Sequence, residues 1–137
     1  MFTLSAKADY GLTAIMELST REPDSPVQIR DLADQHAIPQ HYLEQLLVAL
    51  KRKGIVRSYR GARGGYALAA HPSEIRVLDI FDALDGPIQL LPEKRKGSPI
   101  SFYVRDVEKE LVAALDISLE ELLLRKQKSD EQFIYTI

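Results

Sequence analysis

The sequence of 137 residues contains no cysteine and no tryptophan. Without cysteine the chain forms no disulfide, no thiolate metal site and no thiol nucleophile. Its longest apolar stretches fall far short of the ~20 residues that a membrane-spanning helix needs. The first ten residues already hold Lys7 and Asp9, which is not typical of a secretory signal. These absences predict a cytoplasmic protein that does not enter a membrane.

A catalytic constellation is also missing from the sequence. The three histidines, His36, His41 and His71, are scattered, and none shares metal-ligand spacing on one helical face. The sequence shows no serine, histidine and aspartate in an arrangement typical of a catalytic triad. Because catalysis needs positioned groups, we expect no enzyme activity, no metal and no cofactor.

Charge is present but unevenly distributed, although the net charge is only −2. From residue 40 to residue 66 there is one acid, Glu44, against six cations: Lys51, Arg52, Lys53, Arg57, Arg60 and Arg63. From residue 100 to residue 137 eight acids outnumber five bases. A basic face on one part of a chain suits docking on a polyanion. Lys51 to Lys53 alone fit a solvated helix end about as well.

The stretch from Ile29 to Ala69 predicts two helices joined by a tight turn and followed by a hairpin. The first helix should begin near Arg30, and the second should run from Gln40 to about Lys53 and end at Gly54. Ala37 takes the turn position usually given to glycine. The side chains that such a pair must bury are Leu32, Ala33, Ile38, Leu43 and Leu46.

The hairpin is predicted from two short segments of strand composition, 55–59 and 66–69. Its loop, Arg60-Gly61-Ala62-Arg63-Gly64-Gly65, carries two arginines among glycines that permit close backbone approach. Val27 and Ile29 are expected to add a short strand. No Lys-Ser/Thr follows the glycines, so the loop is not a nucleotide-phosphate cradle. A plain hairpin with surface arginines is the alternative.

The fold class is therefore mainly α with a small β-hairpin, a winged helix-turn-helix domain over residues 1–85. Helices are expected over residues 5–20 and from residue 77 to Gly86, and residues 86–100 form a loop. Residues 101–137 should hold a long dimerisation helix over 101–115, a short helix opened by the capping box at Ser118, and an apolar strand-like tail over 133–137.

A helix-turn-helix places its second helix in the DNA major groove, and a basic hairpin reaches the backbone or the minor groove. The predicted DNA-contacting residues are Gln40, His41, Tyr42, Glu44, Gln45, Lys51, Arg52, Arg57, Arg60 and Arg63. An acid facing DNA is repelled by phosphate unless it reads a base, so Glu44 either accepts from cytosine or pairs with a nearby cation. Tyr42 fits the core or a phosphate contact equally well.

The helix over 101–115 carries an apolar stripe, Val104, Val107, Leu111 and Ala114, at spacings of three, four and three. This is the pattern of a two-helix seam and predicts a homodimer. Packing of the stripe inside one chain is the alternative.

The segments SAKADYGLTAIMELS (5–19), YLEQLL (42–47) and RGARGGYAL (60–68) together resemble the IscR, NsrR and CymR family of bacterial winged-helix transcription regulators. The resemblance extends to ISLEELL (117–123). It implies a homodimer with crossed long helices on a palindromic promoter site, contacts from Tyr42 and Glu44, and Arg60 in the minor groove. Pro39 stands where relatives often have a polar capping residue.

The resemblance also implies a departure in the loop before the long helix, where iron–sulfur members carry three cysteines. This chain has none there, and a cluster needs thiolates. The sequence is accordingly more similar to the cluster-free CymR-like branch, in which a cysteine-biosynthetic enzyme is the signalling partner. We expect a dimeric repressor that binds double-stranded DNA. The alternative is a protein-interaction module that regulates a metabolic enzyme and binds little DNA itself.

Overall fold

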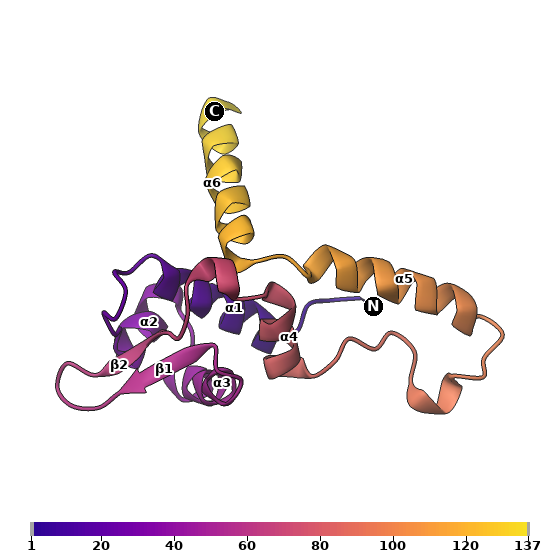
Figure 1. The fold of residues 1–137 in the computed structure, drawn as a ribbon, viewed down its shortest axis with the longest axis horizontal. Coiled ribbons are helices and arrows are strands. Elements are labelled where there is room, and N and C mark those ends of the chain that lie inside the picture. The colour runs from indigo at the N-terminus through magenta and orange to yellow at the C-terminus, as the bar shows by residue number, and fades with distance from the viewer. Residues whose placement is uncertain (1, 137) are drawn as a thin grey trace.

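The computed structural model describes residues 2–136, with side chains up to residue 132. Figure 1 shows that the helices and the hairpin of residues 6–85 form one body, from which the helices over residues 101–115 and 119–136 extend. In chain order the elements are α1 (Ala6–Ser19), α2 (Ile29–His36), α3 (Gln40–Arg52), β1 (Val56–Tyr59), β2 (Gly65–Leu68), η1 (Pro72–Glu74), α4 (Val77–Asp85), η2 (Glu93–Arg95), α5 (Ser101–Leu115) and α6 (Leu119–Thr136).

Helix α1 begins where the sequence predicts, because the Ser5 hydroxyl accepts a hydrogen bond from the Ala8 N–H at 3.0 Å. The same hydroxyl donates to Asp85 at the end of α4. Gly11 faces α4, and a Cβ at this position would overlap the Leu84 side chain. A glycine therefore allows α1 and α4 to pack closely.

The helix-turn-helix is formed by α2 and α3. Ala37 adopts the left-handed conformation with φ 52°, and the Ile38 N–H donates to the Ala33 carbonyl at 3.0 Å. All five side chains expected to be buried in this pair are buried. Gly54, with φ 80°, follows the C-cap of α3. The predicted turn chemistry and core are confirmed.

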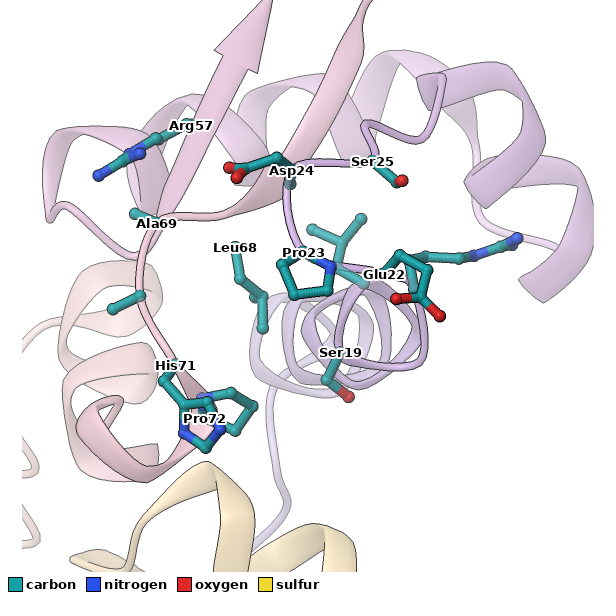
Figure 2. A pocket seen from close by; sticks show the side chains of 14 residues that line it. Ser19, Glu22, Pro23, Asp24, Ser25, Arg57, Leu68, Ala69, His71 and Pro72 are labelled. Atoms are coloured by element: carbon teal, nitrogen blue, oxygen red, sulfur yellow. The ribbon is translucent and has the colours of Figure 1, made fainter.

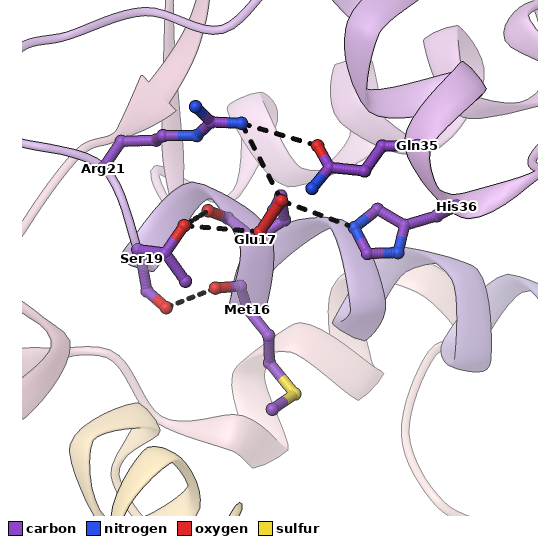
Figure 3. A network of polar contacts seen from close by, with 7 residues as sticks. Met16, Glu17, Ser19, Arg21, Gln35 and His36 are labelled. Carbon is purple, nitrogen blue, oxygen red and sulfur yellow. Dashed lines mark hydrogen bonds and ion pairs between the residues drawn. The ribbon is translucent and has the colours of Figure 1, made fainter. Parts of the chain in front are cut away.

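Polar side chains also hold α2 against α1 (Figure 3). The Glu17 carboxylate of α1 lies 3.8 Å from both Arg21 and the His36 Nε2 of α2. Arg21 also donates to Gln35 at 3.4 Å. This network positions α2, on which α3 is packed.

Strands β1 and β2 pair antiparallel, with Val56 opposite Leu68 and Tyr59 opposite Gly65. Val27 extends the sheet by a single bridge to Tyr66, through hydrogen bonds of 2.8 and 2.9 Å. The expected strand at Val27 is confirmed as this bridge, but Ile29 lies in α2 and not in the strand. Gln28, the residue between Val27 and Ile29, already serves as the N-cap of α2, so the chain turns away from the sheet.

From α4 to the start of α6, the observed elements agree with those predicted from the sequence. Helix α4 buries its expected stripe of Val77, Ile80, Phe81 and Leu84, and α5 has the predicted bounds. The Ser118 hydroxyl caps α6 by accepting from the Glu121 N–H at 3.0 Å. The last helix, however, is neither short nor followed by a strand, since its backbone is helical to Thr136.

Candidate nucleic-acid interface

One face of α3 is exposed along the whole helix. A shallow groove runs along it, lined by His41, Glu44, Gln45, Val48 and Arg52. Gln40 is exposed at the start of the helix, and Gln45 contacts the His41 ring at 3.4 Å. The predicted polar residues thus share one surface.

Val48 lies on this surface and was not predicted from the sequence. Its side chain is 39% exposed. An apolar residue at helical spacing is read as core, so only its position in the folded protein reveals it. A side chain of this type can contact a thymine methyl group.

Glu44 is exposed on α3, close enough to the hairpin for its charge to act on Tyr66. Burial and the negative charge of Glu44 raise the pKa of Tyr66, which lies on β2. No ion pair within the described part of the chain includes Glu44. The structure thus gives no support to the alternative of a cation partner for Glu44.

Tyr42 is half-buried. Its ring meets that of Tyr10 edge to face, with centroids 5.8 Å apart, and it packs against the main hydrophobic core. The buried part of the Tyr42 ring therefore stabilises the contact between α1 and α3. Only the exposed part of the side chain is accessible to DNA.

The loop that joins β1 to β2, residues 60–64, presents Arg60 and Arg63 to solvent. Its base is fixed by two glycines, because a Cβ at Gly64 would overlap the Tyr59 carbonyl and one at Gly65 the Val27 carbonyl. Gln28, the N-cap of α2, donates to the Ala62 carbonyl at 3.0 Å. We call β1, β2 and this loop the wing.

The C-terminal end of α3 is connected to the wing. The Lys51 ammonium donates to the Ser58 hydroxyl at 2.6 Å, and Arg52 is exposed beside it. The cations of α3 and those of the wing loop therefore belong to one connected unit.

Arg57 lies on the face of the wing opposite α3, away from the other predicted DNA-contacting residues. Successive side chains of a strand point to opposite faces, and Ser58 faces α3, whereas the Tyr59 hydroxyl approaches Asp24 at 3.5 Å on the other side. Arg57 shares the face of Tyr59 and lines a cleft with Asp24 and His71 (Figure 2). The sequence grouped Arg57 with the DNA-contacting residues, but the strand separates it from them.

The exposed helix α3, supported by α2 and flanked by a wing with a basic tip, defines the winged helix-turn-helix class of nucleic-acid-binding proteins. Comparison with known proteins gives the same class and a family. Residues 4–127 match the Rrf2 family, described as iron-dependent transcriptional regulators. The chain belongs to the Rrf2 family.

Relatives match over nearly the full length. The HTH-type transcriptional regulator CymR of Bacillus subtilis is 33% identical over 138 residues, which cover 98% of this chain and 99% of that protein. The IscR regulator of Aliivibrio salmonicida is 32% identical, covering 96% of this chain and 84% of that protein. The chain is therefore a DNA-binding transcription regulator, as the sequence predicted. These relatives are regulators and not enzymes.

Solved structures confirm the fold class. The structure of CymR, the global cysteine regulator of B. subtilis, superposes with a TM-score of 0.69 at 34% identity, covering 89% of this chain and 96% of that one. The T. potens IscR structure gives a TM-score of 0.76 at 32% identity, covering 93% and 90% of the two chains.

The family description names iron, but the donor side chains of this protein do not fit a thiolate-held iron site. Cysteine is absent from the whole sequence. Among the described side chains, which reach residue 132, no three histidine, aspartate or glutamate side chains gather as a metal site.

Within residues 2–136, none of the helices combines the length and the apolar character that crossing a bilayer requires.

Proposed function

We propose that the protein is a homodimeric repressor that binds a palindromic promoter site, with α3 in the major groove and Arg60 in the minor groove. The observation that carries the proposal is the exposed face of α3, which the hydrogen bond from Lys51 to Ser58 joins to the wing. Narrow minor grooves attract inserted arginine side chains, and the glycines beside Arg60 let the backbone approach DNA closely.

The homodimer is proposed from α5. None of the described residues of this helix is buried, and two apolar side chains of its stripe lie in solvent, with Val107 40% and Leu111 38% exposed. Contiguous exposed apolar surface on a soluble protein marks an interaction site. Packing of α5 against the same helix of a second copy would cover it and would give the pair the two-fold symmetry of a palindromic site.

The regulatory signal is proposed to act without an iron–sulfur cluster, since the chain has no thiolate. The full-length similarity to CymR, called the global cysteine regulator of B. subtilis, supports genes of cysteine supply as targets. A partner protein as signal carrier is proposed from the family resemblance of the sequence. Co-purification from the native organism, with and without a cysteine source, tests the partner.

The central experiment is selection of bound fragments from genomic DNA, followed by affinity measurements over a range of salt. Selected fragments should share a palindrome, and affinity should fall steeply with salt because phosphate contacts release counterions. Affinity for every genomic fragment equal to that for random duplex would refute the proposal.

Arg60→Ala is expected to weaken binding to the selected site by about tenfold, with the greatest loss at sites that have A·T-rich flanks. Fluorescence anisotropy with labelled duplexes measures this. Lys128→Ala, which removes a cation from the exposed part of α6, is the matched control and should bind as the wild type does. Equal losses in the two variants would indicate a general charge effect and not a minor-groove contact.

Glu44→Ala is expected to relax base preference at one position of each half-site, with a loss of about 1–3 kcal/mol of discrimination. Binding to random duplex should become slightly tighter, because a carboxylate no longer faces phosphate. Binding of a randomised duplex library followed by sequencing gives the preference at each position. Glu131→Ala on α6 is the control, and an unchanged preference profile in Glu44→Ala would remove base reading from the role of Glu44.

A further inference from the structure

A cleft of about 410 Å³ lies on the side of the wing that faces away from α3. Three segments form it: the end of α1 with the loop to α2, the strands β1 and β2, and the turn that leads to η1. Figure 2 shows Asp24 and Pro23 on one side, Arg57 and Ala69 on the other, Leu68 between them, and His71 with Pro72 at one end. This volume is within the range of small-molecule sites.

The interior of the cleft is apolar and its rim carries opposite charges. Leu18, Leu68, Pro23 and Pro72 supply the apolar lining. Arg57 is exposed and takes part in no ion pair among the described residues. Asp24 has only a long contact, 3.5 Å, from the Tyr59 hydroxyl. The rim thus holds one guanidinium and one carboxylate that are not paired with each other.

These two charges lie on the rim of the same cleft, where one small molecule can meet both. Arg57 and Tyr59 are two residues apart on one face of β1, about 7 Å along the strand, and Asp24 sits beside the Tyr59 hydroxyl. The other rim charges are directed elsewhere: Arg21 contacts Glu17 and Gln35, and Glu22 lies on the far side of Pro23 from Leu68 in Figure 2. A cation and an anion on the rim of one cleft, above an apolar floor, complement a zwitterion with an apolar side chain.

Asp24 has an unusual backbone for a residue other than glycine, with φ 62°. Aspartate tolerates this conformation better than most residues, and such conformations concentrate at functional sites. Here it holds the carboxylate at the cleft, on the loop that leads into α2.

We propose that this cleft binds an α-amino acid with an apolar side chain, its carboxylate on Arg57 and its ammonium group on Asp24. The two sides of the cleft are continuous with the DNA-binding surface. The loop that holds Asp24 leads into α2, and the strand that holds Arg57, β1, is part of the wing. Occupancy therefore ties the wing to the helix-turn-helix and changes DNA affinity. The regulatory half of this inference rests on the proposed function, whereas binding in the cleft does not.

The test is titration of the full-length protein without DNA, followed by two-dimensional amide NMR, with the common L-amino acids added one at a time at about 1 mM. At least one apolar amino acid should shift the amides of residues 18–25 and 67–72 and leave unchanged those of residues 126–132, which lie along α6 beyond its contact with His71. Its carboxamide and its deaminated acid, each lacking one of the two charges, should bind at least about tenfold more weakly. No shifted amide with any amino acid, or equal binding of the singly charged analogues, would overturn the proposal.

Two substitutions assign the charges. Arg57→Gln and Asp24→Asn should each weaken binding about tenfold to a hundredfold, and asparagine retains the tolerance of a left-handed backbone at position 24. Lys128→Gln, which removes a cation far along the chain on α6, should bind the amino acid as the wild type does. Undiminished binding in both cleft variants would overturn the assignment.

The DNA arm separates the two proposals. The amino acid that binds should shift the affinity of the wild type for its selected site, and the shift should vanish in Arg57→Gln. Binding in the cleft with no change in DNA affinity would refute the regulatory half alone. A cleft that binds in a protein without specific DNA binding would refute the proposed function alone.

Discussion

Replacing Gly65 with alanine is expected to abolish specific DNA binding and to lower the free energy of unfolding by about 3 kcal/mol. Gly65 has φ 144°, and a Cβ there would overlap the carbonyl of Val27. To relieve the overlap, β2 must move away from Val27 and lose the hydrogen bonds of 2.8 and 2.9 Å between Val27 and Tyr66. The wing would then lose its fixed position beside α3. Urea denaturation and fluorescence anisotropy measure the two effects.

Gly61→Ala is the matched control for this substitution. Gly61 also has a positive φ, 100°, but a Cβ there would meet no atom within 4 Å. Only conformational strain remains, about 1 kcal/mol, and DNA binding should be largely retained. If the two variants were equally stable and bound DNA equally well, the contact between β2 and Val27 would not be what positions the wing.

Introducing aspartate at Val107 and Leu111 together is expected to convert the proposed homodimer into monomers and to weaken binding to a full palindromic site at least about a hundredfold. A carboxylate buried at a helix seam without a partner costs several kcal/mol, and a monomer engages one half-site only. Because α5 buries none of its described residues within one chain, the helix-turn-helix should remain folded. Sedimentation equilibrium gives the oligomeric state, and thermal unfolding checks the fold.

Lys109→Asp is the control for the seam variant. Lys109 is exposed on α5 and, by helical periodicity, lies on the side opposite Val107 and Leu111. It should remain dimeric and bind the full site. A wild-type protein that is monomeric at micromolar concentration while still binding palindromic DNA tightly, or a seam variant that stays dimeric, would contradict the role proposed for α5.

The resemblance of three short segments to a known family predicted the class and function that the comparisons confirmed. Local signals also gave most of the helix boundaries. The Ser5 and Ser118 caps, the left-handed Ala37 and the glycine after α3 each act within a few residues, so the sequence contains what is needed to place them. The length of α6 was missed because its second half has no apolar stripe. Ion pairs four residues apart, such as Lys126 with Asp130 at 2.6 Å, support it instead.

By itself, the sequence determined the helix-turn-helix, the wing and the concentration of cations between residues 40 and 66, because periodicity, turn residues and charge are local properties. Only the tertiary structure decided which side of the wing each side chain occupies. The two faces of a strand alternate residue by residue, and the packing of Ser58 toward Lys51 sends Arg57 to the opposite face. The tertiary structure likewise left Val48 exposed and brought Asp24, Arg57 and His71 to one cleft. These positions depend on contacts between segments far apart in the chain.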